Sequence, residues 1–201
     1  TIVHLGDLLE GYLHGMYAEM FLSLALGVGL DAACGFRVFL PLFMISLLTH
    51  FDIGGLGLNE DLLWMGGLPA MVAFGVATLL ELFAYYLPVV DHALDAIAVP
   101  LATLAGTLVV AGTLVDLPPL LHWSLALIAG GGVAGLVKGA AAGTRLASTA
   151  TTAGLGNPVV ATVETAGSIL FTFLSWFLPV LGLTLVLVLL WGLYRLVFKR
   201  K

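Results

Sequence analysis

Charged residues are scarce in this chain. They make up 9% of its 201 residues, while hydrophobic residues make up 61%, and soluble globular domains carry about a quarter charged residues. The composition therefore excludes an ordinary soluble domain. The single cysteine, Cys34, excludes an intrachain disulfide framework, and we expect its thiol to pack rather than to react. Residues 1–10 contain Asp7 and Glu10 in place of a basic region, so we expect no cleavable signal peptide.

Long apolar runs take the place of charge. They are continuous rather than alternating, which favours transmembrane helices of about 20 residues over barrel strands. The sequence thus predicts an all-α, polytopic integral membrane protein with about six or seven transmembrane or re-entrant helices. We expect an N-terminal interfacial segment, 1–15, and a single transmembrane domain, 16–198. The expected spans are 16–30, 38–51, 68–87, 89–115, 120–142, 158–178 and 180–198.

The first two expected spans are short for a full crossing. Between them we expect a break at 31–37, where Asp31, Gly35 and Arg37 interrupt the apolar sequence. Two complete crossings and a broken or re-entrant pair both remain open.

Basic residues beside the spans predict the orientation, because they gather on the cytoplasmic side of a membrane. They place the C-terminus of this multi-pass protein in the cytoplasm. The residues concerned are Lys138, Arg145, Arg195, Lys199, Arg200 and Lys201. The lipid bilayer is then the main partner, and we expect no nucleic-acid partner. A homo-oligomer and a larger membrane complex both remain open.

An internal repeat is also expected. Gly27, Gly35 and Arg37 match Gly135, Gly143 and Arg145 at one constant offset along the chain. The sequence Pro-Val-Val occurs at both 88–90 and 158–160. We therefore expect two related halves, about 16–116 and 120–198, that run parallel in the membrane.

Two groups of residues resemble a known family. The first comprises Gly35-Phe-Arg37, Leu40-Pro41, Leu80-Glu81, Pro88 to Asp91, and Asp95; the second comprises Arg145, Ser148-Thr149, Thr151-Thr152, Gly154 to Val160, and Glu164. With these residues the chain is similar to the small bacterial membrane proteins known as domain of unknown function 4126. The resemblance supports the helical membrane architecture, but it implies no chemistry and leaves the cofactor unknown. The chain departs from the family at Ala153, where a second glycine is expected, and at Thr165, where an acidic residue is usual.

Ionisable residues within apolar spans point to function, because a charge at bilayer depth costs about 2.5–3.5 kcal/mol on insertion scales. We expect a polar centre toward the cytoplasmic side, and with its neighbouring hydroxyl groups it would line a substrate or ion pathway. The candidate residues are Arg37, Glu81, Asp91, Asp95, Arg145, Ser148, Thr149, Thr152, Asn157 and Glu164. Structural ion pairs are the alternative interpretation of the same charges, and catalysis is a third.

A metal site is a separate hypothesis. Asp91, His92 and Asp95 offer oxygen and imidazole ligands for a divalent metal, although on a helix His92 points away from Asp91, which favours a hydrogen-bonded cluster instead. The sequence contains no nucleotide-binding, zinc or nucleophile motif, so we name no catalytic residue and do not expect an enzyme. The leading hypothesis is a transporter or channel for an ion or small polar solute. The alternatives are a membrane-embedded metal enzyme acting on a lipid-borne substrate and a structural or accessory subunit.

The polar segment 145–157 is expected to be an ordered, partly buried turn between two helices. It contains no lysine, glutamate or proline, which flexible linkers favour, and Gly154 and Gly156 allow unusual backbone geometry. We expect Arg145 to bind a carboxylate, with Glu164 and Asp91 as the first candidates.

Overall fold

The computed structural model describes residues 2–54, 58–86, 88–114 and 117–198. For 2–12, 88–93, 95–96 and 197–198 it describes the backbone alone. The described chain is helical and contains no strand. The helices are α1 (Ile2–Phe36), α2 (Phe39–His50), α3 (Leu68–Ala84), α4 (Pro88–Thr113), α5 (Pro119–Leu125), α6 (Gly132–Thr152), α7 (Asn157–Phe177) and α8 (Pro179–Phe198), with a 3₁₀ segment, η1 (Glu60–Gly66), and a π-helical segment, η2 (Ala126–Gly131).

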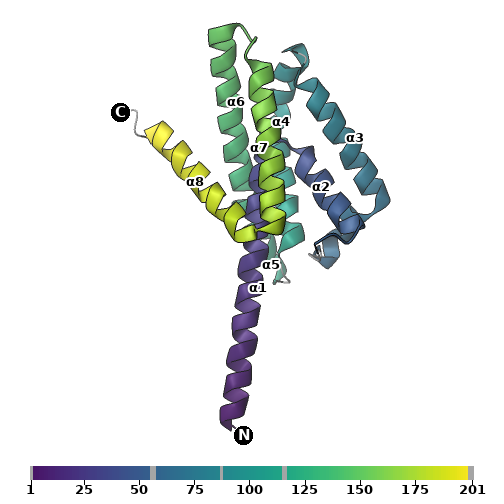
Figure 1. The fold of residues 1–201 in the computed structure, drawn as a ribbon, viewed down its shortest axis with the longest axis vertical. Helices are drawn as coiled ribbons and strands as arrows, with labels where there is room; N and C mark the ends of the chain where they lie inside the picture. The colour runs from purple at the N-terminus through teal and green to yellow at the C-terminus, as the bar shows by residue number, and fades with distance from the viewer. Residues whose placement is uncertain (1, 55–57, 87, 115–116, 199–201) are drawn as a thin grey trace.

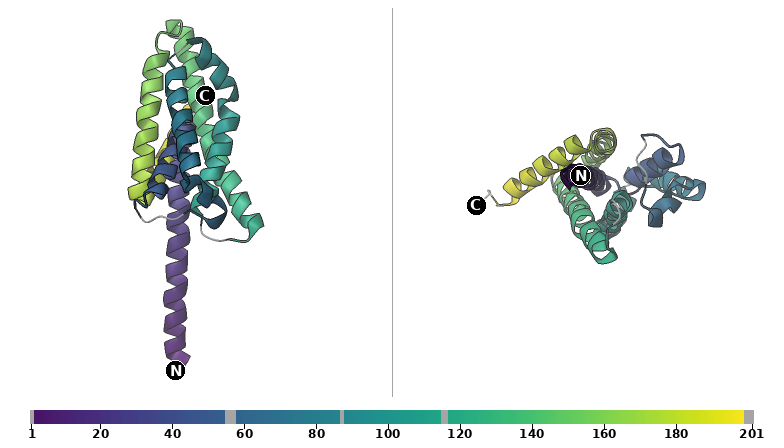
Figure 2. Two further views of the ribbon diagram at one scale, coloured as in Figure 1. Left: turned by 90° about the vertical axis from the view of Figure 1, so that its right-hand side faces the viewer. Right: turned by 90° about the horizontal axis from the view of Figure 1, so that it is seen from below.

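Helix α1 is the centre of the bundle. It contacts α2, α4, α6, α7 and α8, and its N-terminal half extends beyond the other helices (Figures 1 and 2). Helix α2 turns back from the end of α1 and packs against α3. Helices α4, α6 and α7 run along α1, while α8 slants away from α6 (Figure 1). The C-terminal end of α1 is therefore enclosed on several sides.

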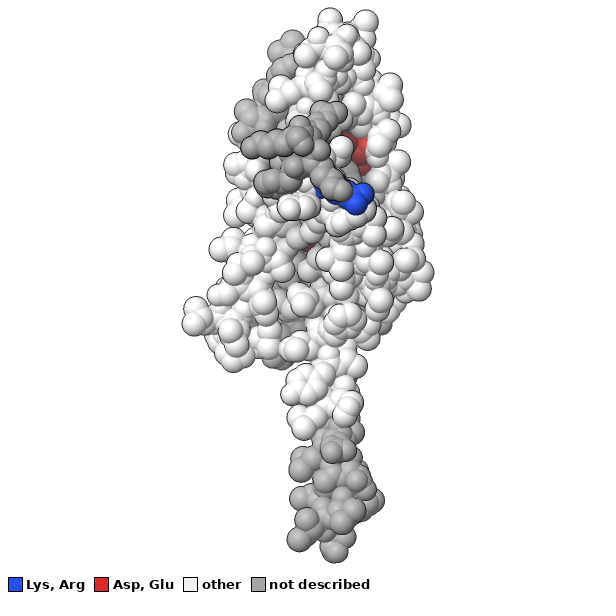
Figure 3. All heavy atoms as spheres, turned by 90° about the vertical axis from the view of Figure 1, so that its left-hand side faces the viewer, with Lys and Arg blue, Asp and Glu red and all other residues white. Residues whose placement is uncertain are grey.

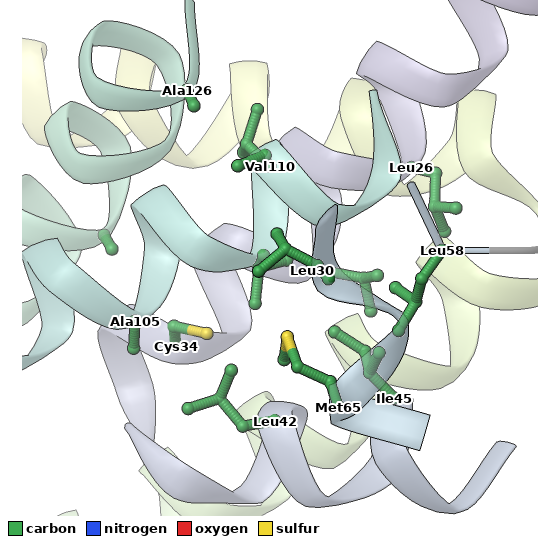
Figure 4. Close-up of a cluster of buried hydrophobic side chains, with 14 of the residues drawn as sticks. Leu26, Leu30, Cys34, Leu42, Ile45, Leu58, Met65, Ala105, Val110 and Ala126 are labelled. Atoms are coloured by element: carbon green, nitrogen blue, oxygen red, sulfur yellow. The ribbon is translucent and has the colours of Figure 1, made fainter. Parts of the chain in front are cut away.

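The apolar core forms where α1, α2, α4 and η1 meet. Leu30 and Cys34 of α1 pack there with Ile45 of α2, Met65 of η1 and Val110 of α4, all fully or nearly fully buried (Figure 4). Cys34 is a free, buried thiol, which confirms that it packs in the core. Small residues such as Ala102, Ala105 and Ala134 belong to the same cluster, and they let the helices approach closely.

Within the described part of the chain, four helices are long and apolar enough to cross a membrane: Leu13–Phe36, Pro119–Thr152, Asn157–Phe177 and Pro179–Leu196. A fifth span results if η1 and α3, which meet at 63°, are counted together. The remaining expected spans, 38–51 and 89–115, correspond to the shorter apolar helices Phe39–His50 and Ile97–Thr113. The chain is a membrane protein built from helices, and the expected count of six or seven spans is not confirmed.

The break expected at 31–37 is wrong for most of its length. Helix α1 continues through Asp31 to Phe36, and the chain reverses at Arg37 and Val38. The polar residue Asp31 is tolerated inside the helix because its carboxylate accepts a hydrogen bond from the Ala134 N–H. The expected interfacial segment 1–15 likewise continues into α1 without a break in the helix.

The segment 145–157 is ordered, but most of it is helix rather than turn. Helix α6 extends ten residues beyond the expected end at Ala142, to Thr152. Its hydroxyl groups stay compatible with the helix by donating to carbonyls one turn back, as Thr151 does to Ala147 and Thr152 to Ser148. The turn itself is 153–156, where Ala153 and Gly154 have φ of 52° and 87°. The expected unusual geometry thus occurs at Gly154 and not at Gly156.

A buried charged centre at the end of helix α1

An ion pair joins α6 to α7. Arg145 Nε donates to Glu164 Oε1 at 3.0 Å, and its Nη2 contacts Oε2. The two side chains are 2% and 4% exposed. This bidentate geometry is the strongest form of a carboxylate–guanidinium pair, and it confirms the expected pairing of Arg145 with Glu164.

Tyr85 brings three cations together. The guanidinium carbons of Arg145 and Arg37 lie 4.0 Å and 4.4 Å from the centroid of its ring, and the Lys138 ammonium lies 5.1 Å from it. Tyr85 follows the end of α3 and is itself buried. A cation over an aromatic face gains about 2 kcal/mol or more when the pair is desolvated. The tyrosine ring therefore stabilises the positive charge of these three side chains.

Arg37 closes the end of α1 and reaches α7. Its Nε donates to Thr165 Oγ1 at 3.0 Å and its Nη2 to the Ala161 carbonyl at 2.7 Å. The side chain is 0% exposed, and Nη1 has no hydrogen-bond partner among the described residues. Thr165 is thus the neutral acceptor for this guanidinium.

Lys138 binds the C-terminal end of α1. Its Nζ donates to the Phe36 carbonyl at 3.2 Å. The last carbonyls of a helix lack partners within the helix and carry partial negative charge. A cation at this position therefore satisfies both the orphan carbonyl and the helix dipole.

Glu81 caps the N-terminal end of α2. Its two carboxylate oxygens accept hydrogen bonds from the backbone N–H groups of Val38 and Phe39, at 2.9 Å and 3.0 Å. These N–H groups begin α2 and have no acceptor within the helix. The negative charge of Glu81 thus lies at the positive end of a helix dipole.

These residues form one cluster, which we call the charged centre: Arg37, Glu81, Tyr85, Lys138, Arg145 and Glu164. All six are buried. Among the described side chains it contains three cations and two carboxylates, so cationic charge exceeds anionic charge by one. On the face of the molecule drawn in Figure 3, the charged atoms of the described residues are visible as one small blue area and in two red hollows.

Two pockets flank the charged centre. One, of about 320 Å³, lies among α2, α3 and α4, and Glu81 and Tyr85 form part of its wall with Leu94. The other, of about 370 Å³, lies among α6, α7 and α8, and Glu164 forms part of its wall with Val137. Among the described side chains, both linings are otherwise almost entirely apolar. Counted over these side chains, each pocket offers one carboxylate within a hydrophobic surface.

Not all the expected pathway residues belong to this centre. Arg37, Glu81, Arg145 and Glu164 come together as expected. Asn157 and Thr149 lie at the α6–α7 junction, where Asn157 Nδ2 donates to Thr149 Oγ1 at 3.1 Å.

Ser148 and Thr152 hold the turn between α6 and α7. The Thr152 hydroxyl donates to the Ser148 carbonyl and accepts from the Gly156 N–H at 2.9 Å. These contacts give both residues a structural role.

The side chains of Asp91, His92 and Asp95 lie outside the described residues. The backbone places all three on the first turns of α4, and Leu94, on the same turns, lines the pocket beside Glu81. Among the described residues, no three acidic, histidine or cysteine side chains are grouped to hold a metal ion.

Two members of the charged centre, Lys138 and Tyr85, are absent from the candidate residues named from the sequence, and so is Thr165, which binds Arg37. Lys138 is a charge within an apolar span, as the other candidates are, but in the sequence it also lies where a basic residue indicates the cytoplasmic side. Tyr85 carries no signal that separates it from the other aromatic residues. Thr165 is uncharged, so the search for charges in apolar spans does not find it. Asp31 was assigned to a break, although it lies in the helical core and is fully buried.

The fold and the centre define an all-helical membrane protein with charged groups enclosed between its helices. A family model described as "Domain of unknown function (DUF4126)" matches residues 24–199, and the chain belongs to this family. The resemblance seen in the sequence is thereby confirmed. The curated proteins and the solved structures contain no match to the chain.

Proposed function

We propose that this protein is a transporter or channel of the bacterial cytoplasmic membrane, with its C-terminus in the cytoplasm, that moves a small ion or polar solute through the charged centre. The observation that carries the proposal is the excess of cations over carboxylates among the described side chains around Tyr85, where Arg37 Nη1 has no hydrogen-bond partner in the described part of the chain. The same excess favours an anionic solute.

A purely structural ion-pair network accounts less well for these contacts. Leaving a buried donor unsatisfied costs about 1–3 kcal/mol, and more for a charged group. A network selected only to hold helices together would satisfy each donor, because a partly satisfied network is worse than an apolar core. Arg37 Nη1 departs from that rule, and an anion would supply the missing acceptor.

The two pockets suggest the route. Arg145 binds Glu164, which lines one pocket, and lies on the ring of Tyr85, which lines the other. A rearrangement of this one side chain would change the barrier between the two pockets. Transporter folds often place their binding site at the interface between repeats. The proposed repeat agrees with this arrangement, since its matched residues Arg37 and Arg145 lie on the same tyrosine ring.

Solute flux into proteoliposomes tests the proposal. Purified protein would be assayed with chloride, nitrate, phosphate and small carboxylates, and with sodium and potassium. Glu81→Gln and Arg145→Ala should each change the flux of the transported solute. Arg195→Ala is the matched control, because Arg195 makes a cation–π contact with Trp191 outside the charged centre. Unaltered flux in both centre variants would reject these residues as the pathway.

A structural or accessory subunit is the second candidate. A Cβ atom at Gly139 or Gly143 of α6 would have nothing within 4 Å, and a space of about 610 Å³ separates this part of α6 from α8. Small residues on a membrane helix favour close helix association. Recovery of the protein only within a larger complex, with no flux on reconstitution of the isolated chain, would favour this function.

A further inference from the structure

Asp31 is an acidic side chain in the middle of the apolar core. It lies on α1 and is 0% exposed. Its Oδ2 accepts a hydrogen bond from the Ala134 N–H at 3.1 Å, whereas Oδ1 has no partner among the described residues. A Cβ atom added to Gly106 of α4 would overlap Oδ1. The carboxyl group therefore lies directly against the backbone of a neighbouring helix.

The hydrogen bond to Ala134 has a local cause. The chain is π-helical at Ala126–Gly131 and α-helical from Gly132. A change from i→i−5 to i→i−4 hydrogen bonding interrupts the regular ladder, and π segments are often found at functional sites. Asp31 supplies an acceptor from another helix just beyond this change. An asparagine oxygen would serve the same purpose, so the hydrogen bond alone does not account for an acid.

No described cation pairs with Asp31. Within α1, the titratable group nearest to Asp31 along the chain is Cys34, one turn further on. Arg37, just beyond the end of α1, binds α7 instead. On α6, the Lys138 ammonium donates to the Phe36 carbonyl.

The other helices packed around Asp31 present no charge to it. On α7, Ser168 donates its hydroxyl to the Ala33 carbonyl at 3.0 Å, and Glu164 binds Arg145. The described part of α4 from 97 to 113, η2 and the part of α8 packed on α1 contain no charged residue. Glu81 is a second carboxylate within electrostatic reach of Cys34, and it caps α2.

We propose that Asp31 is a proton-binding site, with Oδ1 protonated in the conformation described. An ionised carboxylate with a single hydrogen bond at this depth would be costly, and a proton removes that charge. The contact with Gly106 leaves no room for a hydrated cation at Oδ1. When the packing of α1 against α4 and α6 opens, the O–H bond breaks, the proton passes to water, and the bonding electron pair stays on the carboxylate. Asp31 thus couples proton release to a movement of these helices.

This site is separate from the charged centre. Its ligand is a proton and its residue is Asp31, which is not part of the charged centre. Its test needs no transported solute. If the centre moves an anion, Asp31 supplies the residue through which a proton could be coupled to that movement.

Infrared spectroscopy of the full chain in lipid nanodiscs tests the proposal. Wild-type protein at neutral pH should show a carboxylic-acid C=O band that shifts in D₂O. Asp31→Asn should lack this band, since the amide keeps an oxygen for the Ala134 N–H but cannot be protonated in this range. Thr172→Val is the control and should retain the band, because the buried Thr172 hydroxyl donates its hydrogen bond within its own helix, to the Ser168 carbonyl. Equal bands in wild type and Asp31→Asn would overturn the assignment.

A second measurement does not depend on the folding of a variant. Wild-type protein carrying a ¹³C-labelled aspartate side-chain carboxyl should show an isotope-shifted acid band at neutral pH, which identifies a protonated aspartate. Absence of any shifted band would overturn the proposal. Loss of the band on adding sodium chloride at constant pH would also overturn it, because it would identify Na⁺ rather than a proton as the ligand.

Discussion

The guanidinium of Arg145 and the carboxylate of Glu164 bind each other across α6 and α7, where both are almost completely buried. Removing either residue leaves the other charge buried without its partner in this ion pair, and breaking such a pair costs about 3–5 kcal/mol. We expect Arg145→Met and Glu164→Leu each to lower the free energy of unfolding by about that amount. The double variant should lose much less than the sum of the two single changes. Unfolding in mixed micelles measures all four proteins, and additive losses would contradict the coupling.

The ring of Tyr85 should matter more than its hydroxyl group for holding the cations. Tyr85→Phe keeps the aromatic face on which Arg37, Lys138 and Arg145 lie, whereas Tyr85→Leu removes it. We expect the leucine variant to be less stable than the phenylalanine variant by about 2 kcal/mol or more. Thermal unfolding of the two purified variants gives the comparison. Trp191→Leu, which removes an exposed cation–π contact with Arg195, should cost only about 0.5–1 kcal/mol.

Two glycines provide a test of close helix packing. A methyl group at Gly106 would overlap the Asp31 carboxyl, while one at Gly143 would have nothing within 4 Å. Gly106→Ala should therefore destabilise the protein by about 1–3 kcal/mol, as overpacking does. Gly143→Ala should be neutral or stabilising by up to about 1 kcal/mol, since alanine favours a helix more than glycine does. Equal melting temperatures for the two variants would show that α1 and α4 do not pack as described.

The sequence predicted the helical membrane class and four members of the charged centre. It did so because Arg37, Glu81, Arg145 and Glu164 are charges in apolar surroundings, and such charges form ion pairs or belong to a functional site. It could not predict Tyr85, because an aromatic residue in a membrane helix is ordinary until its neighbours are known.

The wrong helix boundaries have a common physical reason. Asp31 and the hydroxyl groups of 148–152 read as breaks or loops, because polar groups disfavour a membrane helix when they lack partners. Each found a partner that periodicity does not reveal: the N–H of a distant helix for Asp31 and carbonyls of the same helix for Thr151 and Thr152.

Variants at Thr165 distinguish a structural role of the charged centre from its proposed role in transport. Its hydroxyl accepts from Arg37 Nε at 3.0 Å and donates to the Ala161 carbonyl at 2.8 Å, so Arg37 has a neutral oxygen where a carboxylate would fit. Thr165→Asp would give this guanidinium an ionic partner and bring the described carboxylates level with the cations. We expect the variant to be at least as stable as wild type in thermal unfolding, yet to pass less anion in the proteoliposome assay. Thr165→Val, which leaves Arg37 Nε unsatisfied, should instead lose about 1–3 kcal/mol of stability. If Thr165→Asp kept the full anion flux while gaining stability, the excess positive charge would have no part in transport.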